Sequence, residues 1–301
     1  FRYFPKHECM AAYAMIRRSN HSDPMLQLEN RNIFCMQKLS LCANGRFLLE
    51  NNDFCENNND DAISVSPLSV GICSSDIPRA FEAKAYFYPL TLGHEVVCRV
   101  NEETANGPKK GGKFVLFPLI PCMKCKMCKC GSYNLCENYS YYGSRTDGGM
   151  QERMNVKRWN LIAIPAELNS DIAALCEPVS VCIHAFEKIG KSKNVLLYGG
   201  GFLAQILARI LGNRDCKVSC IDRNIYKKDF FDELVDFSTD LKIFDNRIFD
   251  VIIDCCGSEN SLKNAIELVK AGGKVLQLAN LEKSALLESE KIYSTTFDIV
   301  L

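Results

Sequence analysis

Residues 194–206 read NVLLYGGGFLAQI, an apolar run that ends in three glycines and continues into residues typical of a helix. Gly199, Gly201 and Ala204 have the spacing G-x-G-x-x-A. After a strand, such small residues permit a tight turn and let the backbone approach a pyrophosphate at the helix N-terminus. The spacing alone is weak evidence, but Asp222 ends the next apolar run, KVSCID, about twenty residues further on. Together these features predict a dinucleotide site.

The acidic residue after the second strand bears on which dinucleotide binds. Asp222 would accept hydrogen bonds from the ribose hydroxyls and repel a 2′-phosphate, which favours NAD. Arg223 follows it and leaves NADP open as the alternative. The residues predicted to bind the cofactor are Gly199, Gly201, Phe202, Leu203, Ala204, Asp222 and Arg223.

The chain after Pro165 alternates apolar strand-like runs with helical segments. This pattern predicts a parallel sheet covered by helices on both faces. The segments are a helical region over 171–190, strands over 194–199, 217–222, 250–257 and 274–279, and helices over 202–212 and 258–273.

The part of the chain before Pro165 has a different sequence pattern. From Met36 short alternating runs are separated by turn signals, such as Asn44-Gly45 between KLSLC and RFLLE, which predicts a β-rich region. With 301 residues, 47% of them apolar, the chain can bury two cores. We expect an extension of unknown role over 1–35, a β-rich domain over 36–186 and an α/β domain over 187–301.

Charge and hydropathy exclude some partners. Lys and Arg together number 36, as do Asp and Glu, so no charge excess favours nucleic acid or a membrane surface. No run has the roughly 18 to 20 apolar residues of a membrane helix, and the first residues lack the layout of a signal peptide. We expect a cytoplasmic protein with a small-molecule partner.

Residues 121–136, PCMKCKMCKCGSYNLC, contain five of the 17 cysteines. Four of them fit C-x2-C-x2-C-x7-C, and four thiolates are a closed tetrahedral shell for a structural zinc ion. Unrelated free thiols and an iron–sulfur cluster are the alternatives. The four predicted ligands are Cys122, Cys125, Cys128 and Cys136, which leaves Cys130 as the odd one.

A second metal site is suggested by three separate residues. Cys73 in VGICSSD, His94 in TLGHEVV and Glu177 in ALCEPVSV are a thiol, an imidazole and a carboxylate. Such a set with one open position is the composition of a catalytic zinc site. For each residue taken singly, spacing favours the structural alternative: a core thiol, a hydrogen-bonded turn histidine and a helix-end charge.

These motifs, with GSRTDGG and YGGGFLA, occur in the order and spacing of the zinc-containing medium-chain dehydrogenases, which the chain resembles over residues 36–301. The resemblance implies a GroES-like catalytic domain followed by a Rossmann domain, and two zinc ions per chain. It implies Cys73, His94 and Glu177 as catalytic zinc ligands, Glu95 as an acid that binds or approaches that zinc, Ser75 as the proton relay, and Asp76 as the acid that orients the histidine. Pro78 stands where many members have a second relay residue, a histidine.

The resemblance also implies hydride transfer between NAD and a secondary alcohol of a polyol or sugar phosphate. Arg79 and Arg145 are candidate phosphate ligands, with ordinary surface arginines as the alternative, whereas Tyr86, Tyr88 and His184 read as packing residues. The alternatives are a ribulose-5-phosphate, ribitol-5-phosphate or sorbitol-type reductase, and an inactive relative that binds zinc and NAD. Family members form dimers or tetramers and continue beyond the position of Leu301, so a homo-oligomer is expected only if the shorter chain still assembles.

Overall fold

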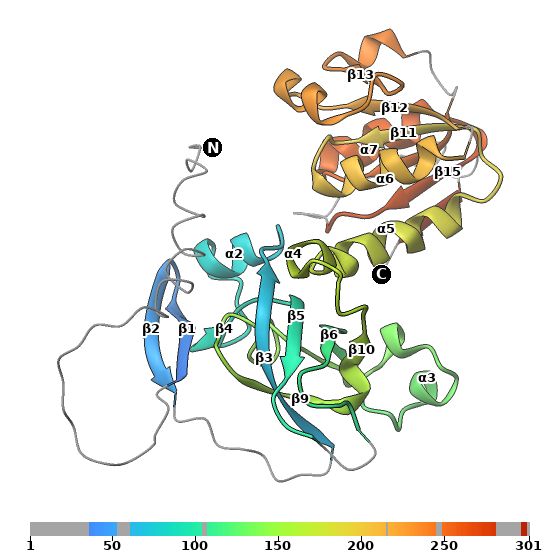
Figure 1. Cartoon of the computed structure of the whole chain (residues 1–301). Coiled ribbons are helices and arrows are strands. Elements are labelled where there is room, and N and C mark those ends of the chain that lie inside the picture. The colour runs from blue at the N-terminus through green and yellow to red at the C-terminus, as the bar shows by residue number, and fades with distance from the viewer. Residues whose placement is uncertain are drawn as a thin grey trace, which may run out of the picture. The chain divides into compact units, whose positions relative to one another are not determined.

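The computed structural model describes residues 36–52, 61–103, 107–214, 216–244, 249–280 and the strand backbone at 296–299. The extension predicted over 1–35 lies outside these residues. Figure 1 shows a mainly β region formed by the first half of the described chain and an α/β region formed by the second half.

The second half forms a parallel sheet of six strands in the order β13-β12-β11-β14-β15-β16. The chain starts in the middle of this sheet at β11, runs outward on one side and then crosses to the other, which is the doubly wound order. The strands are β11 (Asn194–Tyr198), β12 (Lys217–Ile221), β13 (Asp236–Ser238), β14 (Phe249–Asp254), β15 (Val269–Gln277) and β16 (Thr296–Ile299).

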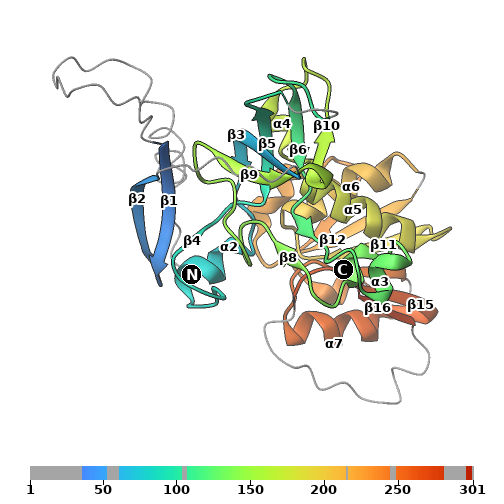
Figure 2. The same ribbon diagram turned by 90° about the horizontal axis from the view of Figure 1, so that it is seen from below.

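Helices cover both faces of this sheet, because successive strand residues point to opposite sides. Val195 and Leu197 of β11 pack with α5 (Cys176–Ile189) and α6 (Phe202–Gly212). Leu196, between them, packs on the other face with α7 (Glu259–Leu268). Figures 1 and 2 show α5 and α6 on one side of the sheet and α7 on the other. The continuous apolar runs of the sequence are thus explained by burial on both sides.

The first half contains antiparallel sheets with the orders β10-β6-β5-β3-β9, β2-β1-β4 and β7-β8. Their main core is formed by alternate residues of β3, β5 and β9, among them Ile63, Val65, Val96 and Val156. The elements are β1 (Met36–Ala43), β2 (Arg46–Asn52), β3 (Ala62–Gly71), α2 (Asp76–Phe81), β4 (Leu90–Thr91), β5 (Glu95–Val100), β6 (Lys113–Leu116), β7 (Leu119–Ile120), α3 (Lys126–Lys129), β8 (Ser140–Tyr141), β9 (Met154–Lys157), β10 (Leu161–Ala163) and α4 (Ser170–Ala173).

The predicted hairpin at Asn44-Gly45 is present, with Ala43 paired to Arg46. The apolar stretch KFVLFPLI at 113–120 forms two strands, because Pro118 lacks the N–H needed for the strand ladder and β6 ends at Leu116. Asn160 bridges the break, because its side-chain amide donates to the carbonyl oxygens of Phe117 and Leu119 at 2.6 Å each.

One helix boundary was predicted wrongly. The helix expected over 258–273 ends at Leu268, and Val269 already begins β15. Gly272 has a φ of +73°, and a Cβ on Gly273 would lie 2.9 Å from the carbonyl oxygen of Asp250. These glycines therefore suit a strand that approaches its neighbour closely. The predicted domain boundary at 186/187 falls within α5, and the division into domains stays a prediction.

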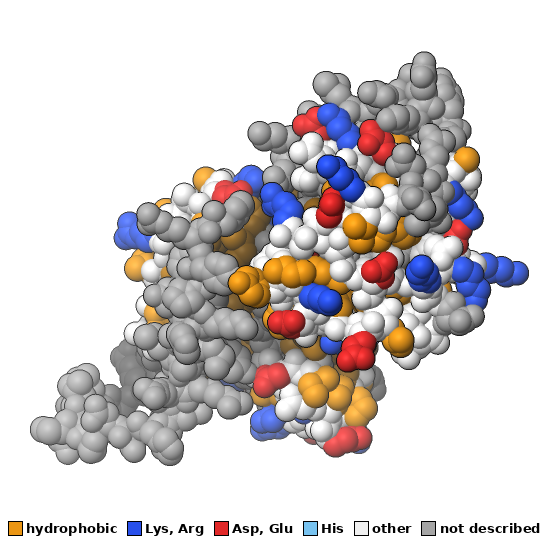
Figure 3. Space-filling view, turned by 90° about the horizontal axis from the view of Figure 1, so that it is seen from above, with side chains coloured by type: hydrophobic (Ala, Val, Ile, Leu, Met, Phe, Trp, Pro, Cys, Tyr) orange, Lys and Arg blue, Asp and Glu red, His pale blue; other side chains and the backbone are white. Residues whose placement is uncertain are grey.

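The described surface offers no concentrated charge in the view of Figure 3, where basic and acidic side chains are interspersed. None of the helices in the described part of the chain has the length and apolar character required to cross a membrane.

Candidate metal and dinucleotide sites

Three side chains of types that can bind a metal ion meet at the end of two paired strands. Gly71, the last residue of β3, pairs with Glu95, the first residue of antiparallel β5. Cys73 follows β3 by two residues and His94 directly precedes β5, so strand pairing brings them together. One ligand atom from each of Cys73, His94 and Glu95 lies within 4.8 Å of the others. This arrangement has the donor types and compactness that a zinc ion requires.

Asp76 fixes two members of this cluster. Its Oδ2 accepts the backbone N–H of Cys73 at 3.1 Å, and its Oδ1 lies 3.5 Å from Nδ1 of His94. Both groups are buried, and neither Oδ1 nor Nδ1 has another hydrogen-bond partner among the described residues. Nδ1 therefore faces the acid, which leaves Nε2 as the nitrogen available to a metal.

Glu177 lies beside this cluster but is not one of the three closely grouped donors. It is in the first turn of α5, and its Oε1 accepts a hydrogen bond from the Tyr141 hydroxyl at 3.2 Å. The Tyr141 ring in turn meets the His94 ring edge-on, with centroids 5.8 Å apart. Tyr141 was not predicted as a site residue, because its contacts with Glu177 and His94 are tertiary and correspond to no local sequence pattern.

The acid–base properties of the site favour a cation. Burial raises the pKa of Glu95, and the charge of Glu177 raises it further. Burial lowers the pKa of His94, but Asp76 and Cys73 outweigh this and raise it to about 10. Several anionic groups thus converge in a buried place, and a bound divalent ion would relieve their repulsion. The residues fit a zinc ion on these grounds.

The serine expected to relay a proton is held by an arginine. Arg79 Nη1 donates to Ser75 Oγ at 2.9 Å and to the Ser75 carbonyl oxygen at 2.7 Å. Ser75 is the N-cap of α2, yet its side chain makes no capping hydrogen bond, so the hydroxyl proton stays available. Arg79 also lies 3.6 Å from Asp76, so its charge is already compensated.

The four thiols predicted to hold a structural zinc ion lie close together. One sulfur from each of Cys122, Cys125, Cys128 and Cys136 lies within 4.8 Å of the others, whereas Cys130 is exposed and outside the group. Backbone amides point at the sulfurs: the Cys122 N–H donates to Cys136 Sγ at 3.2 Å and the Cys125 N–H to Cys122 Sγ at 3.4 Å. Hydrogen bonds from the amides of Cys128 and Glu137 lower the pKa of Cys125 to about 6. These sulfurs fit a closed tetrathiolate site.

The glycine turn has the geometry that a dinucleotide site requires. Gly199 has a φ of +103°, a region that favours glycine. Gly201 is the N-cap of α6, and a Cβ there would meet no heavy atom within 4 Å. The space in front of this helix N-terminus is therefore open to a phosphate. Of the other predicted residues, Ala204 is buried in the core behind the turn, whereas Phe202 and Arg223 are exposed and Leu203 is partly buried.

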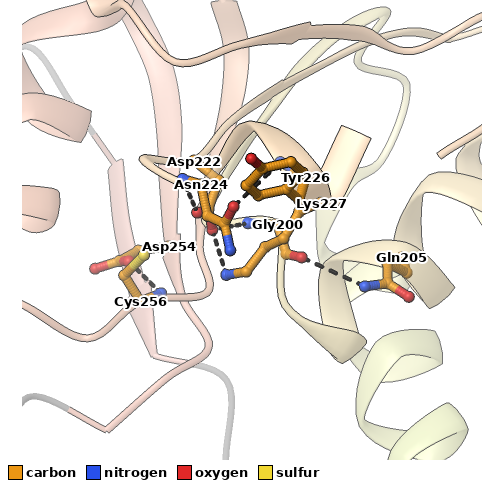
Figure 4. A network of polar contacts seen from close by, with 8 residues as sticks. All are labelled: Gly200, Gln205, Asp222, Asn224, Tyr226, Lys227, Asp254 and Cys256. Atoms are coloured by element: carbon orange, nitrogen blue, oxygen red, sulfur yellow. Dashed lines mark hydrogen bonds and ion pairs between the residues drawn. The ribbon is translucent and has the colours of Figure 1, made fainter. Parts of the chain in front are cut away.

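Asp222 is the centre of the network in Figure 4. Its Oδ2 accepts the Gly200 N–H at 2.8 Å and lies 2.6 Å from Lys227 Nζ, while its Oδ1 accepts the Asn224 N–H at 2.8 Å. Burial would raise the pKa of Asp222, but Lys227 and these two amides outweigh it and lower the pKa. The acid is thus ionised and fixed directly beside the glycine turn. Lys227 was not predicted from the sequence.

Comparison with known proteins matches residues 59–166 to the alcohol dehydrogenase GroES-like domain. Galactitol 1-phosphate 5-dehydrogenase of Escherichia coli (strain K12) is 37% identical over 145 residues, which cover 47% of this chain and 42% of that protein. L-idonate 5-dehydrogenase of Vitis vinifera is 29% identical over 239 residues, covering 71% of this chain and 65% of the relative. The chain thus matches less than two thirds of the length of either protein.

A crystal structure of galactitol-1-phosphate dehydrogenase from Escherichia coli superposes with a TM-score of 0.79 and 25% identity, over 88% of this chain and 83% of that one. This confirms a GroES-like region followed by a Rossmann region. The chain is thus similar to zinc-type polyol and sugar alcohol dehydrogenases, and its residues 59–166 match the alcohol dehydrogenase GroES-like domain.

Proposed function

We propose that this protein is a zinc-dependent oxidoreductase that transfers a hydride between a secondary alcohol of a polyol or sugar phosphate and NAD. The observation that carries the proposal is the convergence of Cys73, His94 and Glu95 within 4.8 Å. The relatives named above support this class of substrate, and the glycine turn with Asp222 supports the cofactor.

The catalytic metal would be held by Cys73, by Nε2 of His94 and by a carboxylate. Glu95 is the carboxylate that lies in the group with Cys73 and His94. Glu177 is a second candidate, and it accepts a hydrogen bond from Tyr141. A zinc ion bound there would act as a Lewis acid that lowers the pKa of the substrate alcohol. A second, structural zinc ion would be held by the four clustered thiols.

Ser75 would accept the proton of the substrate alcohol. Arg79 donates to Ser75 Oγ, so it orients the hydroxyl and leaves its proton free to leave. A guanidinium has no site that accepts a hydrogen bond, so Arg79 orients Ser75 but does not take up its proton.

The open N-terminus of α6 would bind the pyrophosphate, and Asp222 would bind the adenosine ribose. The bound dinucleotide would supply the hydride acceptor. Because Asp222 is ionised, a 2′-phosphate would meet a negative charge, although Lys227 and the exposed Arg223 reduce this repulsion. We therefore propose NAD as the preferred cofactor.

Two measurements on the purified full chain test the proposal: zinc content by mass spectrometry, and formation of NADH or NADPH with galactitol 1-phosphate, L-idonate and sorbitol. We expect two zinc ions per chain and turnover of at least one substrate, faster with NAD. Cys73→Ser should lose one zinc ion and turnover, whereas the control Cys42→Ser, in β1, should keep both. Two bound zinc ions without turnover on any of these alcohols would reject the enzyme and leave a binding protein.

A further inference from the structure

Arg145 is held between two tyrosine rings on the surface of the β-rich region. Its guanidinium carbon lies 4.4 Å from the ring centroid of Tyr86 and 4.5 Å from that of Tyr139. Its Nη2 also donates to the hydroxyl oxygens of Tyr86 and Tyr139, at 3.4 and 3.3 Å. Two stacked rings restrict a side chain that otherwise has many rotamers, so the guanidinium is oriented before any ligand arrives.

The charge of Arg145 is not compensated by any acidic side chain in the described part of the chain. Among the described residues no carboxylate forms an ion pair with it, and its contacts with the tyrosines are all neutral. The two arginines predicted as phosphate ligands therefore differ, because Arg79 is occupied by Asp76 and Ser75. Nη1 and Nε of Arg145 have no hydrogen-bond partner in the described part of the chain, so each retains an N–H donor available to an oxyanion.

The turn that carries Arg145 is fixed to the group formed by Cys73, His94 and Glu95. The Arg145 N–H donates to the carbonyl oxygen of Tyr141 at 2.9 Å, and Tyr141 contacts both His94 and Glu177. In the same segment Gly143 lies so close to Gly93 that a Cβ on it would come within 2.8 Å of the Gly93 carbonyl carbon.

Further backbone bonds secure this segment. The Gly148 N–H donates to the Thr91 carbonyl oxygen at 2.7 Å, and the Gly149 N–H donates to the Gly93 carbonyl oxygen at 2.8 Å. The segment 141–149 therefore packs directly against the residues that precede His94. The backbone that carries Arg145 is thus fixed relative to His94.

We propose that Arg145, held by Tyr86 and Tyr139, is a specificity-determining residue that binds the anionic end of the substrate, a phosphate monoester or a carboxylate carried by a polyol. This rests on the proposed function, because it assigns the substrate class to the same site. Binding energy gained at an end of the substrate that does not react can be used to position the alcohol that does.

The first test compares three alcohols: galactitol 1-phosphate, L-idonate and the neutral sorbitol. The ratio of kcat/KM for each anionic substrate to that for sorbitol is measured in the wild type and in Arg145→Gln. We expect the ratio to fall about 10- to 100-fold, mainly through KM, since a charged hydrogen bond contributes about 1.5–3 kcal/mol. Arg145→Lys should restore part of the ratio, because it keeps the charge but lacks the planar guanidinium that stacks between the two tyrosine rings.

The control is Arg99→Gln, which removes an exposed arginine from β5 and should leave the ratio unchanged. The two anions separate the two sources of the oxyanion: the larger fall identifies the one that the site prefers. A ratio that stays within about twofold of the wild type in Arg145→Gln, for both anionic substrates, would overturn the proposal. So would an equal fall in Arg99→Gln.

A binding measurement separates this inference from the proposed function. Titration calorimetry of galactitol 1-phosphate and of L-idonate into the zinc-loaded protein, without dinucleotide, needs no turnover. Binding that weakens about tenfold or more in Arg145→Gln but not in Arg99→Gln would support the anion site even if no alcohol is oxidised. Turnover of all three alcohols with binding independent of Arg145 would support the dehydrogenase and reject the anion site.

Discussion

Gly71 faces Glu95 across the β3–β5 pair, so closely that a methyl group on Gly71 would overlap the Glu95 carboxylate. A glycine is therefore the residue that lets the acid lie in its observed position beside Cys73 and His94. The identity of residue 71 therefore affects the geometry of the proposed metal site.

Gly71→Ala should displace the Glu95 side chain and weaken the metal site while leaving the fold intact. We expect the zinc content to fall from two ions toward one per chain, with loss of turnover. The matched control is Gly212→Ala at the end of α6, where an added Cβ would meet no heavy atom within 4 Å. Equal zinc contents in the two variants would show that Glu95 is not needed to hold the ion.

Asp76→Asn tests how the histidine is oriented. The amide can no longer offer two acceptor oxygens to the Cys73 N–H and to His94 Nδ1. Loss of such a partner typically lowers metal affinity about 10- to 100-fold. Competition with a zinc chelator should show this for one of the two ions, whereas Asp229→Asn, on an exposed helical turn, should match the wild type. Unaltered affinity in Asp76→Asn would contradict the assigned role.

The fold was predictable where periodicity and motif agreed. The strand, glycine turn and helix at 194–212 and the hairpin at Asn44-Gly45 follow from local chemistry. The segment after Leu268 was not predictable in the same way, because VKAGG suits either a helix end or a strand. Pairing with β14 decides it.

The sites show a similar limit. The spacing of the four thiols was enough to predict that they lie together, because they belong to one loop. The hydrogen bonds from Arg79 to Ser75 and from Tyr141 to Glu177 were not predicted, because such side-chain contacts have no signature in one sequence. Likewise Glu95, which was named only through the family resemblance, lies in the compact donor group, whereas Glu177 lies beside it.

Cys136→Ser should destabilise the loop that the four thiols close. This cysteine is buried and accepts the Cys122 N–H. Without a fourth thiolate the structural zinc ion should be bound more weakly, and the midpoint of thermal unfolding should fall. Cys130→Ser, in the same loop but outside the thiol group, is the matched control and should keep both zinc and stability. A similar midpoint for both variants would argue against a metal in this loop.

Asp222→Asn tests the preference for NAD. The change removes the negative charge beside the glycine turn and leaves Lys227 without its partner. A 2′-phosphate would then meet the cations Lys227 and Arg223 instead of an acid, so the ratio of the Kd for NADP to the Kd for NAD should fall about tenfold or more. Fluorescence titration with both reduced cofactors measures this ratio. An unchanged ratio would show that Asp222 does not discriminate between them.

Asp250 gives a prediction about stability that is independent of any ligand. Its Oδ2 accepts the N–H groups of Lys193 and Asn194 at 2.8 and 2.9 Å, and its Oδ1 pairs with Lys270. Burial would raise the pKa of Asp250, but Lys270 and the two amides outweigh it and lower the pKa. The folded state therefore binds this proton less readily than the unfolded state does.

The carboxylate should thus stabilise the fold above the ordinary aspartate pKa of about 3.9, and lose this effect as the pH falls through its lower folded value. Asp250→Asn should lower the free energy of unfolding by about 1–2 kcal/mol near neutral pH, because the charged hydrogen bonds are weakened. Urea unfolding at about pH 7, 5 and 3 should show the gap from the wild type shrinking toward the lowest pH. Asp236→Asn, at an exposed position of β13, should show no such gap, and a gap for Asp250→Asn that grows on acidification would contradict the assignment.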